Sequence, residues 1–466
     1  MSPTDPLLAS ALEQARLIRE RALGAEELTR IYLARIARHN DALQAFVEIN
    51  GRRALAAARR KDEEVMRGDA RDLPPFHGVP LGIKDLNLAR GTFTRFGSRA
   101  FKYVWTPFDD KTTAQLRRGG FVILGKLATS EIGAMPVTEP SIHPPTRNPW
   151  SLDHSAGGSS GGSGAAVAAG LLPIAQGSDG AGSIRIPSAF CHLFGLKPSR
   201  GRVADPYGRP DAHTLATSGP IARTVDDAAA MLDVMAGLSV GTPHWAARPP
   251  RAFAKLARET PPRLRIKVLT RSPLVTPHPE ITEATLRVGR LLAELGHTVE
   301  EGPEPVGSLE EFLPIWQKMI ADIPVPRWSL TQPITRWLAQ AGKPLRAEDI
   351  ESRRAELEHR ILTWFGDADL WITPTVALPA PRIGAFTSAD PAADFHKAAE
   401  LGAFTALFNI SGQPAASVPA GLTSDGLPIG VQLAGKLLAE GTVLSVAKQL
   451  EIAMPWSERR ADIASR

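Results

Sequence analysis

Two glycine- and serine-rich stretches constrain the fold of this chain more than any other feature of its sequence. Residues 157–164 read Gly-Gly-Ser-Ser-Gly-Gly-Ser-Gly, and residues 177–183 read Gly-Ser-Asp-Gly-Ala-Gly-Ser. The apolar sequence between them predicts a short helix over 165–169 and a buried strand over 171–175. A flexible linker would instead be flanked by polar sequence. Since glycine lets a backbone come close to another group, the two loops favour a ligand site.

The remainder of the chain predicts an α/β fold. The first seventy residues have the apolar spacing of helices, and beyond them short apolar runs alternate with helical segments, which is typical of helices layered on a buried sheet. No clean linker is present, so we expect a single domain over 1–466, with a helical segment over 1–70 packed on a core over 71–466. The Pro- and Arg-rich stretch 241–262 is expected at the surface. Helices are predicted at 7–21, 25–38, 51–68, 112–118, 280–295 and 440–452, and strands at 79–83, 121–125, 264–269, 298–300, 415–419 and 429–433.

Composition and charge exclude several classes of protein. The 466 residues are 43% hydrophobic and 22% charged, as in an average globular protein. A net charge of +5, without a basic cluster on one face, does not suit a nucleic-acid partner. Residues 1–10 lack a signal-peptide pattern, and the apolar run 165–175 is too short to span a membrane. The single cysteine, Cys191, fits a reducing compartment. We expect a cytoplasmic monomer or homodimer, with no membrane partner.

The sequence predicts neither a metal nor a cofactor. A phosphate-binding loop needs a lysine after its glycines, and neither loop has one. The histidines do not stand at the spacing of helical zinc ligands. His154 is the one histidine near the loops, and a lone loop histidine is more often a surface residue than a base.

Short motifs spread over nearly the whole chain stand in the order and spacing of one known family. They are Gly82-Ile83-Lys84-Asp85, Leu124-Gly125-Lys126, Arg147-Asn148-Pro149-Trp150, the block 157–163, the block 182–187, Gly195-Leu196-Lys197-Pro198, Ile372-Thr373-Pro374-Thr375, the block 408–412 and the block 426–432. The sequence therefore resembles the amidase signature family, and within it bacterial amidases that act on linear or cyclic aminohexanoate oligomers. The resemblance implies a large central twisted mixed β-sheet covered by helices on both faces, with a helical N-terminal segment.

The resemblance also implies a Ser–cis-Ser–Lys triad that cleaves amides through an acyl-enzyme. Ser183 would be the nucleophile, Ser159 the serine that follows a cis peptide bond, and Lys84 the base. This agrees with elementary chemistry, because a serine hydroxyl needs a base and a lysine is a base only when burial lowers its pKa. The structural alternative for Lys84 is a salt bridge with Asp85, and the alternative base is His154.

The second loop is expected to form an oxyanion hole, because it precedes a helix predicted to begin at Ile184. The family usually has Thr-Gly-Gly-Ser at this point, and the alanine of this chain keeps its N–H but narrows the approach with its methyl group. We therefore expect an altered acyl-group preference. Asp179 and Arg185 flank the loop and are expected to form an ion pair behind the catalytic groups. The residues expected to donate to the oxyanion are Gly180, Ala181, Gly182 and Ser183.

The expected substrate pocket is apolar, which favours neutral amides, with esters and aryl carbamates as further substrates. Two alternatives stay open. One is the glutamine-hydrolysing subunit of a tRNA-dependent amidotransferase, which partner subunits and glutaminase activity would reveal. The other is a non-catalytic anion-binding protein, which labelling of Ser183 would exclude. The pocket residues are expected to be Ala134, Met135, Pro136, Asn409 and part of 315–337, with Trp316, Trp328 and Trp337 as possible aromatic walls.

Overall fold

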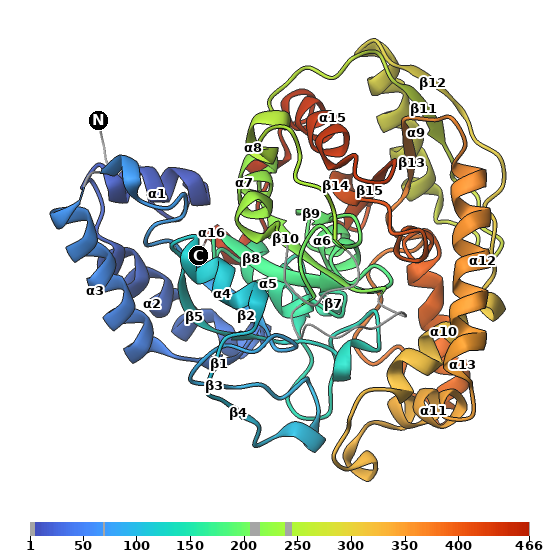
Figure 1. Ribbon diagram of the computed structural model, residues 1–466, viewed down its shortest axis with the longest axis horizontal. Helices are drawn as coiled ribbons and strands as arrows, with labels where there is room; N and C mark the ends of the chain where they lie inside the picture. The colour runs from blue at the N-terminus through green and yellow to red at the C-terminus, as the bar shows by residue number, and fades with distance from the viewer. Residues whose placement is uncertain (1–4, 69, 206–214, 238–244, 466) are drawn as a thin grey trace.

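One mixed β-sheet runs through most of the chain (Figure 1). The computed structural model describes residues 5–68, 70–205, 215–237 and 245–465. Within these residues the sheet has eleven strands. Across the sheet they are β1 (Phe46–Ile49), β5 (Val122–Leu127), β2 (Pro80–Lys84), β8 (Ile174–Asp179), β10 (Thr217–Ala222), β9 (Phe194–Lys197), β14 (Ala415–Leu422), β15 (Pro428–Gly435), β13 (Leu370–Pro374), β11 (Arg265–Val268) and β12 (Thr298–Glu301). Parallel pairs such as β2 with β5 and antiparallel pairs such as β8 with β10 both occur, so the sheet is mixed.

Helices cover both faces of this sheet. The helices of the described residues are α1 (Ala11–Arg19), α2 (Ala25–Leu43), α3 (Gly51–Arg67), α4 (Lys111–Arg118), α5 (Gly161–Ala168), α6 (Arg185–Phe190), α7 (Val225–Met235), α8 (Phe253–Leu256), α9 (Pro279–Glu294), α10 (Leu309–Ala321), α11 (Pro333–Gly342), α12 (Ala347–Phe365), α13 (Pro391–Ala399), α14 (Leu407–Ile410), α15 (Glu440–Ala453) and α16 (Asp462–Ser465). Two short ribbons lie outside the main sheet, one of β3 (Thr92–Phe93) with β4 (Trp105–Thr106) and one of β6 (Arg147–Asn148) with β7 (Ser151–Ser155).

Adjacent residues of the central strands enter different hydrophobic cores. In β8, Ile174 packs in a core that includes residues of α7, α9 and α15, whereas Ala175 packs in a core that includes residues of α2, α3 and α5. In β10, Ala222 packs in the first of these cores and Ile221 in the second. Since successive side chains of a strand point to opposite faces, the sheet is buried on both sides. The predicted α/β class and the mixed sheet are therefore confirmed.

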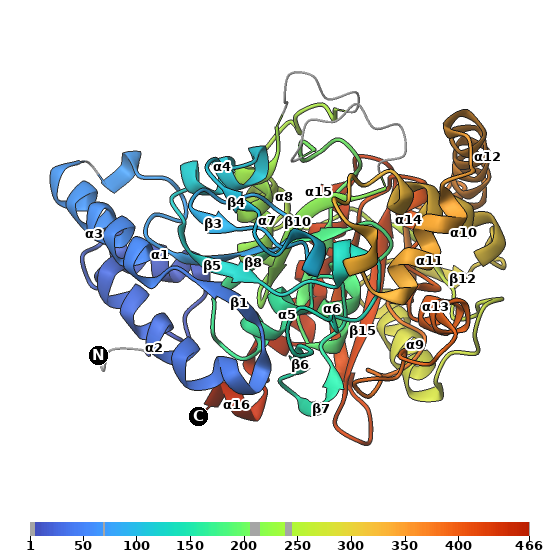
Figure 2. The same ribbon diagram turned by 90° about the horizontal axis from the view of Figure 1, so that it is seen from below.

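The helices α10, α11 and α12 leave the sheet between β12 and β13. Their apolar residues, among them Trp316 and Leu338, form a separate cluster with Ile132 and Ala134. Figure 2 shows these helices at the opposite end of the molecule from α1, α2 and α3. This helical excursion (residues 309–365) forms part of the wall of the cavity described below.

The sequence predicted seven of the eleven strands of the main sheet, but not all of their bounds. The strand β1 lies among residues predicted to be helical, and it pairs with β5. The strand predicted at 171–175 instead spans Ile174–Asp179, because β8 pairs with β10 residue by residue up to Asp179. The helix predicted at 165–169 begins earlier, at Gly161. The strands of the main sheet come from both halves of the chain.

The prediction that residues 241–262 lie at the surface is wrong in part. Residues 241–244 lie outside the described residues. Residues Phe253–Leu256 form α8, and Phe253 is buried against α7 and α15. The backbone N–H of Phe253 donates to Asp233 Oδ1 at 2.7 Å, which fixes the start of the helix.

Candidate active site

The candidate site lies at the ends of two parallel neighbours in the sheet, β2 and β8. Lys84 is the last residue of β2 and Asp179 is the last residue of β8. Parallel strands end at the same edge of a sheet, so the turns that follow them lie together. The turn after β8 carries Ser183, and the loop before α5 carries Ser159. The backbone N–H of Ser160 donates to the carbonyl oxygen of Ser183 at 3.2 Å and joins the two loops.

Lys84 is fully buried and faces hydroxyl groups. Its Nζ donates to Ser159 Oγ at 2.7 Å, to Ser178 Oγ at 3.1 Å and to the Ser178 carbonyl at 3.2 Å. Burial lowers the pKa of Lys84 to about 7, although the charge of Asp179 opposes this shift. An amine with this pKa is largely neutral above neutral pH, so it has a lone pair that accepts a proton.

The salt bridge of Lys84 with Asp85 that the sequence left open is absent. Asp85 pairs instead with Lys126, whose Nζ lies 3.0 Å from Asp85 Oδ1 and also donates to Thr94 Oγ1 at 2.9 Å. Both members of this pair are buried. The carboxylate nearest to Lys84 in the sequence is therefore committed to another lysine.

The loop that carries Ser159 is held by Thr138 and by close backbone contacts. The peptide bond between Gly158 and Ser159 is cis. Thr138 Oγ1 donates to the Gly157 carbonyl at 2.8 Å and accepts from the backbone N–H of Gly161 at 3.1 Å. A Cβ at position 158 would lie 2.7 Å from the backbone of Val137, so only glycine fits there.

A carboxylate organises the turn that carries Ser183. Asp179 Oδ1 accepts from the backbone N–H of Gly182 at 2.7 Å, and Asp179 Oδ2 accepts from that of Ile184 at 3.1 Å. The N–H of Gly182 is thus not directed at a substrate, and the prediction that Gly182 belongs to the oxyanion hole is wrong. The N–H groups of Ala181 and Ser183 have no hydrogen-bond partner in the described part of the chain.

The predicted residues Asp179 and Arg185 form an ion pair in which neither side chain is exposed. Two parallel hydrogen bonds of 2.9 Å join Arg185 Nε and Nη2 to the two carboxylate oxygens. The remaining donors of Arg185 reach Gln432 Oε1 at 2.6 Å, Asn409 Oδ1 at 2.6 Å and the Thr405 carbonyl at 3.0 Å. Burial alone would raise the pKa of Asp179, but the adjacent guanidinium outweighs it and holds that pKa well below its usual range.

Asn409 belongs to this ion-pair cluster and not to the substrate pocket. Its Nδ2 donates to the carbonyl and the carboxylate of Asp179, at 2.9 and 3.0 Å, and to the Leu215 carbonyl at 3.1 Å. With every polar atom of its amide bonded inward, its predicted role in the pocket is wrong. Its neighbours Leu407 and Ile410 line the cavity instead.

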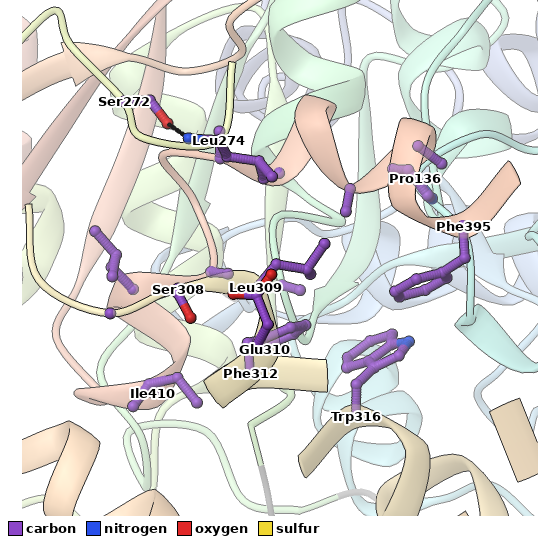
Figure 3. A pocket seen from close by; sticks show the side chains of 18 of the residues that line it. Pro136, Ser272, Leu274, Ser308, Leu309, Glu310, Phe312, Trp316, Phe395 and Ile410 are labelled. Atoms are coloured by element: carbon purple, nitrogen blue, oxygen red, sulfur yellow. Dashed lines mark hydrogen bonds between the residues drawn. The ribbon is translucent and has the colours of Figure 1, made fainter. Parts of the chain in front are cut away.

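A cavity of about 210 Å³ opens beside Ser183 (Figure 3). Ala134, Met135 and Pro136 line it as the sequence predicted, and so does Trp316. Trp316 also packs beside the turn, because a Cβ at position 180 would lie 3.3 Å from its ring. The rest of the wall is mostly apolar and includes Leu274, Val306, Leu309, Phe312, Leu357 and Phe395.

Two of the three tryptophans considered from the sequence do not line this cavity. Trp337 packs behind the wall against Phe395, with ring centroids 5.7 Å apart. Trp328 lies in the single turn Trp328–Leu330, beside Lys343. His154 does not line the cavity either, and its Nδ1 is hydrogen-bonded to Ser151 Oγ at 2.7 Å.

Sequence reasoning missed several residues of the site. Ser178 holds Lys84, Thr138 holds the loop before α5, and Gln176 Oε1 accepts from the backbone N–H of Lys84 at 3.0 Å. Gln176 and Ser178 both lie in β8 and contact Lys84, the former at its backbone N–H and the latter at its Nζ. The described residues contain no cluster of His, Cys, Asp or Glu that suits a metal ion. No described helix is long and apolar enough to cross a bilayer.

Comparisons with known proteins point to one family. Residues 27–444 match the family described as Amidase. The chain is 38% identical to a putative amidase of Synechocystis sp. over 98% of this chain and 91% of that protein. It is 36% identical to a 6-aminohexanoate-cyclic-dimer hydrolase of Pseudomonas sp. over 99% of this chain and 98% of that protein.

Solved structures extend the likeness to the fold. A 6-aminohexanoate cyclic dimer hydrolase complexed with substrate superposes with a TM-score of 0.90 at 33% identity, over 98% of this chain and 99% of that chain. A bacterial aryl acylamidase of the amidase signature family superposes with a TM-score of 0.87 at 28% identity, over 98% of each chain. The fold is therefore the amidase signature fold that the sequence predicted.

The Asp179–Arg185 pair yields a stability prediction. Asp179→Asn leaves a buried guanidinium uncompensated and is expected to lower the free energy of unfolding by about 3–5 kcal/mol. The control Asp367→Asn breaks an exposed pair with Arg265 and should cost less than about 1 kcal/mol. Urea denaturation followed by tryptophan fluorescence measures both. An equal decrease in the free energy of unfolding in the two variants would contradict the larger contribution expected from the buried pair.

The same pair fixes a direction for the pH dependence. The pKa of Asp179 is lower in the folded than in the unfolded protein, so the stabilisation is complete above the unfolded value of about 3.9 and declines as the pH falls below it. Asp179→Asn should therefore flatten the acid limb of the stability profile.

Proposed function

The chain belongs to the amidase signature family of amide-hydrolysing enzymes, and we propose that it cleaves the amide C–N bond through an acyl-enzyme on Ser183. In this proposal Ser159 and Lys84 complete a Ser–cis-Ser–Lys triad. The observation that carries it is the hydrogen bond of 2.7 Å between Lys84 Nζ and Ser159 Oγ, made by a fully buried lysine whose pKa burial has lowered to about 7.

We propose a proton path in which the hydrogen bond between Ser159 Oγ and Lys84 Nζ supports the second transfer. Ser183 Oγ attacks the substrate carbonyl carbon and gives its proton to Ser159 Oγ, whose own proton passes to Lys84 Nζ. The tetrahedral intermediate collapses when the C–N bond breaks, and the leaving amine takes the proton back along the same path. A water molecule then attacks the acyl-enzyme with the same base, which releases the acid and restores Ser183.

The developing oxyanion needs donors that are not already in use. The N–H groups of Ala181 and Ser183 meet this condition, whereas that of Gly182 serves Asp179. Pre-positioned backbone N–H groups stabilise charge that develops in the transition state. We assign the hole to Ala181 and Ser183, with Gly180 as a third candidate.

The apolar wall next to Ser183 suits a neutral substrate at the reacting end. Ala134, Met135 and Pro136 offer no charge that would hold a zwitterion close to the scissile carbonyl. Esters and aryl carbamates present the same carbonyl to the same donors, so we propose them as further substrates. A cytoplasmic location accords with the only cysteine, since Cys191 is a free, buried thiol whose pKa burial raises.

Covalent labelling tests the assignment of the nucleophile. A fluorophosphonate probe is expected to add one adduct on Ser183, read by intact-protein and peptide mass spectrometry. Ser183→Ala should abolish the adduct, whereas Ser272→Ala, which alters another serine of the cavity wall, should retain it. Labelling that survives in Ser183→Ala would refute the proposed nucleophile, and an absence of labelling in the unaltered protein would favour a non-catalytic anion-binding protein.

A pH profile tests the base. Because only neutral Lys84 accepts a proton, kcat/KM for a nitroanilide should rise with pH and reach half its plateau near the lysine pKa of about 7. Lys84→Met matches the length of the side chain without a basic nitrogen and should lower kcat/KM by about a hundredfold or more. Ser159→Ala should lower it severely while the melting temperature changes little. Near-normal turnover by Lys84→Met, or a flat profile, would send the search for a base to another residue.

Substrate comparison separates an amidase of apolar amides from a glutamine-hydrolysing subunit. We expect kcat/KM for an apolar anilide to exceed that for glutamine by at least tenfold, because the glutamine α-carboxylate would lose hydration against an apolar wall. Ammonia release and nitroaniline absorbance measure the two reactions. Faster turnover of glutamine would contradict the proposed preference.

A further inference from the structure

The cavity beside Ser183 has one charged residue in its described wall, Glu310. Its other polar side-chain groups are the hydroxyls of Ser183, Ser272 and Ser308 and the indole N–H of Trp316. Glu310 lies in the first turn of α10, is exposed, and is labelled with Ser308 and Phe312 in Figure 3. The cavity therefore combines a nucleophile and apolar walls with a carboxylate at a solvent-exposed position.

The carboxylate of Glu310 has no cation of the protein bound to it. Neighbouring glutamates do have partners: Glu311 pairs with Arg360 at 2.5 Å, and Glu304 pairs with Arg271 at 2.5 Å. Glu310 forms no salt bridge among the described residues, although the charge of His396 acts on its carboxylate through space. The nearby hydroxyl of Ser308 lowers the pKa of Glu310, so the group is ionised at neutral pH. Its charge is thus available to a ligand in the cavity.

We infer that Glu310 selects substrates whose apolar chain ends in a protonated amine, remote from the scissile amide. The apolar wall would take up the methylene chain, and the ammonium group would lie at the exposed carboxylate, where it keeps part of its hydration. A carboxylate at the same chain end would be repelled, and a methyl group would gain nothing. This inference rests on the proposed amide hydrolysis and concerns only the end of the substrate far from Ser183.

Three nitroanilides of equal chain length test the inference: 6-aminohexanoyl, heptanoyl and mono-adipoyl. The first ends in an ammonium group, the second in a methyl group and the third in a carboxylate. At pH 8 the amine, with a pKa of about 10.4, is charged. We expect kcat/KM for the ammonium substrate to exceed that for the methyl substrate by about fivefold, the upper range for an exposed ion pair. The contrast should shrink in 1 M salt, because added ions screen an exposed pair.

Two substitutions of Glu310 sharpen the test. Glu310→Gln should remove the preference for the ammonium substrate, so that the ratio of kcat/KM for the ammonium and methyl substrates falls to about one. Glu310→Lys should reverse the order, so that the carboxylate substrate is preferred over the ammonium substrate. The matched control is Glu311→Gln, which removes the same charge at the next residue of the chain. The Glu311 side chain pairs with Arg360 and does not line the cavity. It should keep the preference of the unaltered protein.

A second series covers the case in which the amine half of the substrate occupies the cavity. It compares N-(6-aminohexyl)benzamide with N-heptylbenzamide in the same variants. An ammonium preference that depends on Glu310 in either series supports the inference. Hydrolysis without such a preference in both series overturns it and leaves the proposed function intact. No hydrolysis of any amide in either series would overturn the proposed function itself.

Discussion

The buried ion pair of Asp179 and Arg185 is the interaction on which the site depends. Removal of two charges from water costs several kcal/mol per ion and is tolerated only when geometry and hydrogen bonds compensate. Here the guanidinium meets the carboxylate through two bonds and uses its remaining donors on Gln432 of β15 and on Asn409 of α14. The same carboxylate holds the N–H of Gly182, next to Ser183. One ion pair thus fixes the nucleophile turn to elements far apart in the sequence.

Two buried lysines differ in a way that separates the proposed base from a structural cation. Burial lowers the pKa of both Lys84 and Lys126. Lys126 has the carboxylate of Asp85 at 3.0 Å, which favours its charged form. Lys84 has only hydroxyl and carbonyl oxygens within hydrogen-bond distance, and Asp179 acts on it through space. Both side chains are fully buried, so the carboxylates around them make the difference: Asp85, Asp110 and Glu48 favour the charged form of Lys126, and only Asp179 favours that of Lys84.

The local sequence was enough to predict those features, such as strands and glycine-rich turns, that depend on residues adjacent in the chain. The glycine-rich turns pointed to a ligand site, and alternating apolar runs predicted most strands of the sheet. The roles of Ser159 and Ser183 within those turns came from the resemblance to a known family. The errors concern contacts made across the fold. Whether the N–H of Gly182 is free for a substrate depends on whether a side chain accepts a hydrogen bond from it, and Asp179 does. The amide of Asn409 is bonded to Arg185, a residue more than two hundred positions away in the sequence. The extension of β8 through a glycine-rich stretch depends on its pairing with β10, which no local pattern encodes.

The structure divides the chemistry and the cavity wall between different parts of the chain. Lys84, Ser159 and Ser183 stand on strands and turns of the sheet, whereas Glu310 and Trp316 belong to the helical excursion. The two parts meet at Glu131, which is buried and stands three residues before Ala134 of the cavity wall. Its carboxylate accepts a hydrogen bond of 2.6 Å from the backbone N–H of Gln332 in the helical excursion. A change in the excursion can therefore alter what the cavity holds while the ion pair beneath Ser183 stays intact. In the proposed function, the same catalytic groups then serve different amides, because the sheet and its turns hold those groups while part of the cavity wall belongs to helices outside the sheet.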